Sequence, residues 1–278
     1  MDLIEAIPLR IAMKQTSIGY QTDIMLASFD GEIVDRPHHI VIRTPANPTF
    51  WWGNFVLFDC PPSDGDTDKW EMTFAAELGD LPGIKHVNLA WLSAGGATGV
   101  VSPFLDRGYT LTRNIFFVLR GKMLLKDKPP DVEIRAISSD AEWEMALRNQ
   151  HRCLEGANDT PAFRGFQSLQ MIRYRNMTLA NFGYWLGAFI DGELVGDMGI
   201  FGKSGLARCQ AVAVDPNYRR RGIGGAMVRS ACILAQDSLR AETVVIMTGE
   251  DNPARRIYER IGFVPIEQAP SVARSERD

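Results

Sequence analysis

The stretch NYRRRGIGGAMV, residues 217–228, places three arginines directly before three glycines that are spread over four positions. Apolar residues then recur at the spacing of one helix face: Ile223, Met227, Val228, Ala231 and Leu234. The N-terminus of a helix exposes N–H groups that have no acceptor within the helix, and it carries a partial positive charge. Glycine lets an anion reach the main chain, and each arginine can add a charge-assisted hydrogen bond of about 1.5–3 kcal/mol. The stretch therefore suits a diphosphate, although a solvated turn with a few arginines would give the same short pattern.

The composition is that of an ordinary globular chain that is long enough for two domains. Its 278 residues are 45% hydrophobic, and its formal net charge of −4 is too small to predict binding to nucleic acid or membrane. No run of about 18 apolar residues indicates a membrane span, and the start MDLIEAIPLR lacks the layout of a secretory signal. Four cysteines are scattered without a CxxC pair: Cys60, Cys153, Cys209 and Cys232. We expect a cytoplasmic protein without a disulfide framework or a metal site.

The second half of the sequence predicts alternating strands and helices. Ser138 or Ser139 can cap the first helix, and Asp191-Gly192 is a strong hairpin signal. Asn252 can cap the last helix, which Gly262 ends. The predicted order is a strand at 131–137, helices at 138–154 and 161–181, a hairpin at 184–202, a strand at 207–215, the helix after Gly222, a buried strand at 242–249, a helix at 252–263 and a strand at 263–267.

A linker at 121–130 separates this half, residues 131–278, from residues 1–120. It carries three lysines, and Pro129 and Pro130 disfavour helix. The first half predicts a hairpin at 23–35 around Asp30-Gly31, a strand at 50–59, a helix at 66–78, a strand at 85–92, helical residues within 96–106 and a strand at 109–119. Both halves end in the order strand, helix, strand, helix, strand. This order suggests a diverged internal duplication.

The loop and its two neighbours together resemble the GNAT superfamily of acetyl-CoA-dependent N-acetyltransferases. Upstream, a strand runs through Val214 into the loop, and downstream comes NPARRIYERIGF at 252–263. The family signature Gln/Arg-x-x-Gly-x-Gly/Ala is matched by RRRGIG at 219–224. The later Asn-x-x-Ala-x-x-x-Tyr pattern is met in part, because Asn252 and Tyr258 are present but the alanine falls early, at Ala254. The resemblance covers residues 131–267 and implies an α/β (α+β) fold with a mixed, splayed central sheet flanked by helices.

The resemblance implies an acyltransferase that moves an acetyl group from acetyl-CoA to a primary amine of a small molecule or peptide, by direct attack in a ternary complex. It implies that loop amides hold the pyrophosphate, and that the preceding strand pairs with the pantetheine arm. Two central strands, ending at Val214 and near Met247, would splay apart to admit the cofactor. The implied cofactor-binding residues are Val212, Ala213, Val214, Arg219, Arg220, Arg221, Gly222, Ile223, Gly224, Gly225 and Asn252. Alternatively, Asn252 could serve only as the cap of its helix.

Catalytic residues are less evident in the sequence. The family's usual acid corresponds to Tyr258, although this residue also lies on an apolar helix stripe, where its hydroxyl would find a local partner. Some family members carry a glutamate base on the strand before the loop, and Arg208 occupies that place here. Glu155 and Asp159 lie between the first two helices, and either could bind a cationic amine or be a solvated loop acid. His151 is better explained by its place at a helix C-terminus.

Two other functions compete with this interpretation of the sequence. The chain could be a non-catalytic acetyl-CoA-binding regulatory protein that keeps the loop without a base. Nucleic-acid binding through Arg219–Arg221 is disfavoured, because the flanking composition is balanced and no aromatic residues alternate with basic ones. In the first half, the corresponding segment CPPSDGDTDKWE at 60–71 is acidic and would repel a diphosphate. We therefore expect residues 1–120 to be a degenerate acetyltransferase-like or accessory domain.

Overall fold

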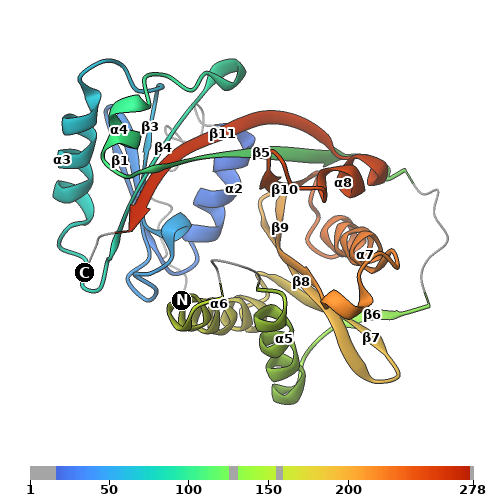
Figure 1. Cartoon of the computed structure of the whole chain (residues 1–278). Coiled ribbons are helices and arrows are strands. Elements are labelled where there is room, and N and C mark those ends of the chain that lie inside the picture. Colours follow the sequence, from blue (N-terminus) through green and yellow to red (C-terminus); the bar gives the residue numbers. More distant parts are fainter. Residues whose placement is uncertain (1–16, 125–130, 155–158, 276–278) are drawn as a thin grey trace, which may run out of the picture. The chain divides into compact units, whose positions relative to one another are not determined.

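The computed structural model of the chain describes residues 17–124, 131–154 and 159–275 (Figure 1). The chain forms two compact units, of which unit 1 comprises Met1–Asn114 and Glu267–Asp278, and unit 2 comprises Ile115–Ile266. The domain division expected from the sequence stays a prediction, and residues 125–130 of its linker lie outside the described residues. The units divide the chain differently because the end of the last strand joins unit 1.

Unit 2 contains a mixed sheet with the strand order β5-β10-β9-β8-β7-β6. Helix α7 packs on one face of this sheet, and α5 and α6 cover the other (Figure 1). The elements are the end of β5 (Thr110–Arg120), β6 (Glu133–Ala136), α5 (Asp140–Arg152), α6 (Pro161–Leu179), β7 (Gly183–Ile190), β8 (Glu193–Lys203), β9 (Leu206–Val214), α7 (Ile223–Asp237), β10 (Thr243–Gly249), α8 (Arg255–Ile261) and the start of β11 (Val264–Ser275). The predicted α/β fold with a mixed sheet between helices is confirmed.

Local signals in the sequence explain several of these elements. Ser139 caps α5 in a capping box, in which its side chain accepts a hydrogen bond from the Glu142 N–H and the Glu142 carboxylate accepts from the Ser139 N–H. Asp191 and Gly192 join β7 to β8 with φ angles of 50° and 80°, as a two-residue turn with the twist of a hairpin requires. The core between the sheet and α7 is apolar, with Met198, Met227 and Val244 fully buried.

The strands of unit 1 follow one another in the order β1-β2-β3-β4-β11-β5, and their pairing is also mixed. The end of β11 pairs antiparallel with β4, from Ser271 opposite Ala90 to Ser275 opposite His86. The last described strand of the chain therefore completes the sheet of its first unit. The other elements are α2 (Ile18–Ala27), β1 (Glu32–Arg36), β2 (His39–Arg43), β3 (Phe55–Phe58), α3 (Asp66–Leu78), β4 (His86–Trp91), α4 (Ser102–Asp106) and the start of β5.

The hairpin predicted at 23–35 is wrong. Residues 18–27 form α2, and the first hairpin lies between β1 and β2, where Arg36 is opposite His39. The Ser17 side chain caps α2 by accepting from the Tyr20 N–H, and the Gly31 N–H donates to the Ala27 oxygen at its end. The buried residues of α2 lie on most sides of the helix, so its sequence shows no single apolar stripe at helical spacing.

Three further elements differ from their predicted extents. The strand predicted at 50–59 begins as a short 3-10 turn at Trp51–Gly53, and β3 follows it. The helical stretch predicted within 96–106 is confined to α4, with another 3-10 turn at Ala94–Gly96. The strand predicted at 263–267 continues to Ser275. The last of these differences depends on pairing distant in sequence, because the end of β11 pairs with β4.

The same order of elements occurs twice along the chain. In unit 1 it is β3-α3-β4-α4-β5, and across the second half of the chain it is β9-α7-β10-α8-β11. The first two strands of each series are parallel neighbours. A left-handed glycine precedes the first helix of each series, namely Gly65 with φ 77° and Gly222 with φ 79°. The two series therefore share the conformation of this glycine as well as the order of their elements, which is what a diverged internal duplication predicts.

Candidate active site

The central strands of unit 2 separate before they end. β9 and β10 pair in parallel only from Leu206 opposite Thr243 to Arg208 opposite Val245. β9 then continues for six residues to Val214, and β10 continues to Gly249. The splay that the resemblance implied, between strands ending at Val214 and near Met247, is present in the structure. It exposes main-chain groups of β9 that a paired strand would cover.

A β-bulge changes the direction of the side chains at the exposed end of β9. Asp197 on β8 is opposite Ala213, whereas Gly199 is opposite Gln210, so two β9 residues, Ala211 and Val212, share one partner. Ala211 has a φ of 48°, which is uncommon for a residue with a side chain. Beyond the bulge, the side chains of Val212 and Val214 line the cavity described below, while Ala213 is buried on the other face.

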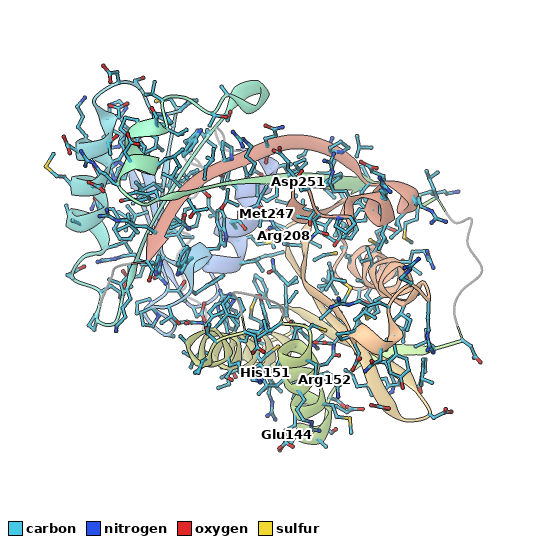
Figure 2. All side chains as sticks on the ribbon, in the orientation of Figure 1. Glu144, His151, Arg152, Arg208, Met247 and Asp251 are labelled. Carbon is cyan, nitrogen blue, oxygen red and sulfur yellow. The ribbon has the colours of Figure 1, made fainter. Side chains whose placement is uncertain are left out.

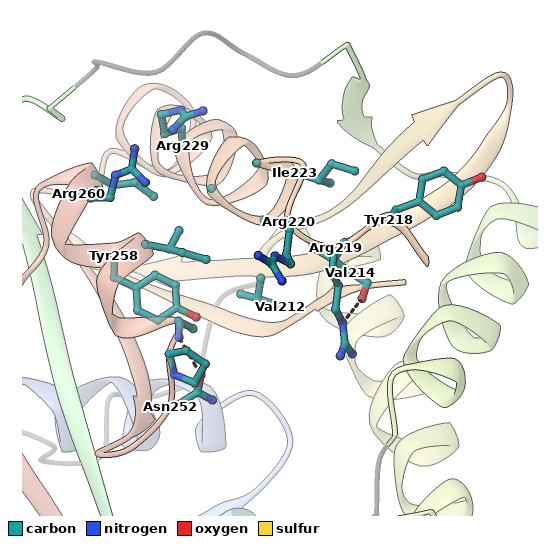
Figure 3. A pocket seen from close by; sticks show the side chains of 17 residues that line it. Val212, Val214, Tyr218, Arg219, Arg220, Ile223, Arg229, Asn252, Tyr258 and Arg260 are labelled. Carbon is teal, nitrogen blue, oxygen red and sulfur yellow. Dashed lines mark hydrogen bonds between the residues drawn. The ribbon is translucent and has the colours of Figure 1, made fainter. Parts of the chain in front are cut away.

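The N-terminus of α7 faces the same space (Figure 3). Its N-cap is Gly222, which has no side chain to supply a cap, and the first N–H donated back into the helix is that of Ala226, to the Gly222 oxygen at 3.0 Å. The N–H groups of Ile223, Gly224 and Gly225 therefore lack an acceptor within the helix. A Cβ placed on Gly224 would meet only Val214, at 3.6 Å, so the main chain is open to a ligand at this point.

The loop between β9 and α7 is held in place by contacts at its base. The buried Asp215 carboxylate accepts from the Asn217 N–H at 2.9 Å and pairs with Arg152 of α5, also at 2.9 Å. The Arg219 Nε atom donates to the Val214 oxygen at 3.2 Å. Arg220 has a φ of 64° and its exposed side chain reaches into the cavity. These bonds fix the direction in which the chain enters α7.

A cavity of about 620 Å³ lies between the loop, α7 and α8. All the residues implied by the resemblance line it except Ala213 and Arg221, whose guanidinium lies 5.0 Å from the Tyr218 ring centre. The sequence did not single out Arg229 or Arg260, although Arg229 lies one helical turn after Gly225, on the same face of α7. The full lining is Val212, Val214, Tyr218, Arg219, Arg220, Gly222, Ile223, Gly224, Gly225, Arg229, Asn252, Pro253, Ala254, Ile257, Tyr258, Arg260 and Ile261.

Tyr258 combines a core position with access to the cavity. Its ring is 6% exposed and packs edge-on against Phe117, with ring centres 6.2 Å apart. Its hydroxyl makes no hydrogen bond to any residue that the structure describes, so the local partner expected for a purely structural tyrosine is missing there. Burial, followed by the nearby Cys209 thiol, raises the pKa of Tyr258 well above its ordinary value. The hydroxyl therefore stays protonated at physiological pH.

Asn252 participates in local structure and also lines the cavity. Its Oδ1 atom accepts from the Ala254 N–H at 2.9 Å, two residues along the chain, so it shapes the turn before α8. The N-cap of α8 is Ala254, and Gly262, with a φ of 112°, ends the helix. The structure thus gives Asn252 a capping role close to the one expected, and it leaves the cofactor role as a prediction.

The residues weighed as a catalytic base are not gathered at the cavity. Arg208 is buried within β9, with its guanidinium 4.9 Å from the Phe116 ring centre (Figure 2). Asp159 is exposed and pairs with Arg164 at 2.7 Å, while Glu155 lies outside the described residues. His151 lies in the last turn of α5 (Figure 2).

A buried carboxyl that the sequence analysis missed is that of Asp197 on β8. It is fully buried and accepts from Gln150 at 3.0 Å, from Trp185 at 2.9 Å and from Asn149. Burial raises the pKa of Asp197 to about 7, and the three donors and the Arg152 charge oppose this shift. An aspartate within the apolar stretch LVGDMGIF at 194–201 was the signal that could have identified it.

The corresponding region of unit 1 is closed. β3 and β4 stay paired to Phe58 opposite Trp91, and the Leu92 N–H donates to the Phe58 oxygen at 2.9 Å. The Phe58 ring stacks on Trp70 with centres 3.8 Å apart, which fills the space beside the strand ends. In the loop before α3, the Asp66 carboxylate accepts from the Ser63 N–H at 2.8 Å. A carboxylate of unit 1 thus already accepts the hydrogen bond of a loop N–H group, at the place where an anion would bind.

Within the described ranges, no group of three or more His, Cys, Asp or Glu residues could hold a metal ion. None of the helices in those ranges is both long and apolar enough to cross a membrane. All four cysteines are free thiols.

One family model matches part of the chain. Residues 181–265 match the model of the acetyltransferase (GNAT) domain, and this range contains the splayed strands, the loop, α7 and Tyr258. No curated protein matches the sequence of the chain.

Solved structures share the fold over nearly the whole chain. A GCN5-related N-acetyltransferase from Kribbella flavida superposes with a TM-score of 0.63 and 15% identity, covering 95% of this chain and 97% of the other. A tandem GNAT protein from the clavulanic acid biosynthesis pathway gives a TM-score of 0.55 and 12% identity, covering 96% and 94%. A functionally unknown conserved protein from Staphylococcus epidermidis gives 0.65 and 13%, covering 89% and 95%. At these identities the likeness concerns the fold, and that fold includes both units.

Proposed function

We propose that this chain, whose residues 181–265 carry a GNAT acetyltransferase domain, moves an acetyl group from acetyl-CoA to a primary amine of a small molecule or peptide. Unit 2 would bind acetyl-CoA, and the amine would attack the thioester directly within a ternary complex. Unit 1 would contribute no second cofactor site, because its strands stay paired where those of unit 2 separate. The four free thiols fit a reducing compartment, and we place the reaction in the cytoplasm.

The observation that carries this proposal is the junction of the splayed strands with the start of α7. The separation of β9 from β10 leaves a slot along Val212 and Val214 for an extended, amide-containing arm. The slot leads to the unbonded N–H groups at the start of α7, which suit the diphosphate of coenzyme A. One continuous cavity therefore offers strand-like pairing and an anion site to the two chemically different parts of a single cofactor.

In the reaction, a neutral amine nitrogen forms a bond to the thioester carbon while the carbon–sulfur bond breaks. Negative charge passes first to the carbonyl oxygen, and the main-chain N–H of Val212, beside the bulge, is the donor we assign to it. The charge then moves to the sulfur of the departing coenzyme A. The attacking nitrogen loses one proton, which goes to water leading out of the site, because the described residues lining the cavity include no carboxylate or histidine.

Tyr258 is the group that we assign to the departing thiolate. Its hydroxyl is at the cavity and makes no hydrogen bond within the described ranges, so its proton can point toward the sulfur. A thiol has a pKa of about 8.5, below that of a buried tyrosine, so complete proton transfer from Tyr258 would be uphill. We therefore expect Tyr258 to stabilise the thiolate by donating a hydrogen bond as the carbon–sulfur bond breaks.

The test combines calorimetry with an assay for free thiol. The protein should bind acetyl-CoA with one site per chain, and a panel of primary amines should include acceptors that release thiol above the hydrolysis rate. Two sites per chain would contradict the assignment of unit 1. An absence of acetyl-CoA binding would remove the whole proposal.

The buried Arg208 favours a second candidate, a non-catalytic acetyl-CoA-binding regulatory protein. It occupies the β9 position where some members of the family carry a glutamate base, and a buried cation cannot accept the amine proton. This alternative predicts tight acetyl-CoA binding, no thiol release with any amine, and no effect of Tyr258→Phe. The catalytic proposal predicts release that Tyr258→Phe slows.

A further inference from the structure

The cavity carries more positive charge than a diphosphate requires. Among its described lining residues are four arginines and no aspartate or glutamate. Arg219 and Arg220 belong to the loop, whereas Arg229 comes from the second turn of α7 and Arg260 from the last turn of α8. The cavity is therefore lined by two cations from separate helices in addition to the two cations of the loop.

The two helix arginines are drawn on the side of the cavity away from Arg219 (Figure 3). A guanidinium nitrogen of Arg229 lies 3.7 Å from where a Cβ on Gly225 would stand, so this side chain turns back along the first turn of α7. It is half-buried, and within the described ranges it makes no ion pair. Its charge is thus held beside the amides at the start of α7, displaced toward α8.

We infer that Arg229 and Arg260 form a subsite for the 3′-phosphate on the ribose of coenzyme A. This inference rests on the proposed function, because it presumes that the diphosphate lies at the start of α7. Coenzyme A carries a second phosphoryl group, a monoester dianion one ribose away from the diphosphate. A pair of arginines beyond the diphosphate site matches a phosphate dianion by charge and by the fork-shaped geometry of its donors. The pair would distinguish coenzyme A thioesters from those of carriers that lack this phosphate.

The inference predicts a preference that can be measured on the unaltered protein. Calorimetry should show that acetyl-CoA binds more tightly than acetyl-3′-dephospho-CoA, by roughly 10- to 100-fold, the loss expected for one or two charge-assisted hydrogen bonds. Because the wild-type chain is compared with two ligands, the result does not depend on whether a variant folds.

Variants then assign the preference to the two arginines. Arg229→Gln and Arg260→Gln should each weaken acetyl-CoA binding while leaving the Kd of acetyl-3′-dephospho-CoA within about twofold, so that the preference shrinks. Arg256→Gln is the matched control, since Arg256 is exposed on the same helix as Arg260 and does not line the cavity. It should keep the full preference.

The outcomes separate the inference from the function on which it rests. Equal wild-type affinity for the two ligands, or variants that weaken both ligands alike, would overturn the 3′-phosphate subsite while the acetyl-CoA site stood. If the wild-type protein bound neither ligand, the proposed function would fall, and the subsite with it.

Discussion

Gln150 of α5 donates a hydrogen bond from Nε2 to the main-chain oxygen of Ala211, at 2.9 Å. The same nitrogen lies 3.0 Å from Oδ2 of the buried Asp197. A helix on one face of the sheet therefore holds the bulge of β9, whose outer side lines the cavity on the opposite face. Because Ala211 keeps an uncommon positive φ, an external bond of this kind helps to maintain the bulge.

The first prediction concerns this bond. Gln150→Met removes the donor at similar volume and leaves two buried acceptors short of a partner, so the free energy of unfolding should fall by about 1–3 kcal/mol. The bulge should relax, and acetyl-CoA affinity should fall roughly tenfold, which calorimetry would measure. Gln236→Met is the control, because its Nε2 atom also donates to a main-chain oxygen, that of Gly121 at 2.9 Å, and this bond does not involve the bulge. Unchanged affinity in Gln150→Met would show that the bulge holds its shape alone.

The second prediction is a pH dependence of stability due to Asp197. Burial raises the pKa of Asp197 to about 7, well above that of an aspartate in the unfolded chain. Between about pH 4 and pH 7 the folded state therefore binds more protons at this residue than the unfolded state does. The contribution of Asp197 to the free energy of unfolding is therefore fully present below pH 4 and is lost as the pH rises through 7. The loss amounts to at most about 4 kcal/mol.

Urea unfolding of the wild-type protein and Asp197→Asn, across pH 4 to 8, isolates this contribution. Asp197→Asn should be less stable at every pH, because its amide faces the donors of Asn149, Gln150 and Trp185. The difference in unfolding free energy between the two proteins should nevertheless shrink as the pH rises, since only the wild-type protein has the buried carboxyl. A constant difference would show that the carboxyl is already ionised at pH 4, held by its donors and by Arg152.

The third prediction separates the hydroxyl of Tyr258 from its ring. Tyr258→Phe should lower kcat roughly 100-fold or more, the usual loss when one transition-state donor is removed. The Kd for acetyl-CoA and the melting temperature should change little, because the hydroxyl makes no hydrogen bond within the described residues.

Tyr174→Phe provides the contrast for that experiment. The Tyr174 hydroxyl donates to Gln210 at 3.2 Å and lies 3.4 Å from the amide of Gln170, in a buried setting. Its removal should therefore lower stability. The two variants carry the same chemical change, but Tyr258→Phe would lose kcat and keep its stability, whereas Tyr174→Phe would lose stability. If Tyr258→Phe lost stability and kept kcat, the residue would be structural.

The sequence was sufficient where local chemistry decides the structure. The Asp191-Gly192 turn, the Ser139 cap and the glycine before α7 each need only neighbouring residues, and all three are present as expected. The residues that line the cavity along the loop follow from the same local pattern.

The sequence was insufficient where distant residues decide the structure. The pairing of β11 with β4 joins Ser271 to Ala90, which are 181 positions apart, and no local pattern encodes it. The side chains of Val212 and Val214 line the cavity, whereas Ala213 is buried on the other face, and this alternation leaves the predicted main-chain contacts of the three residues a prediction. Arg260 was overlooked because it becomes a neighbour of the loop only when α8 packs beside α7, whereas the helical spacing of Arg229 from Gly225 could have indicated its position.

The last prediction tests the main-chain site at the start of α7. Gly224→Trp should abolish acetyl-CoA binding, because a side chain there would occupy the space in front of the unbonded N–H groups. The fold should survive, since a Cβ at Gly224 meets only a side-chain atom of Val214, at an ordinary contact distance of 3.6 Å, and the residue does not have a positive φ. Gly165→Trp is the control, because a Cβ at this exposed position of α6 meets nothing within 4 Å. Circular dichroism would confirm folding and calorimetry would measure binding. If Gly224→Trp retained affinity, the phosphates would have to bind elsewhere in unit 2, and neither the acetyl-CoA site nor the 3′-phosphate subsite described above could stand where we place them.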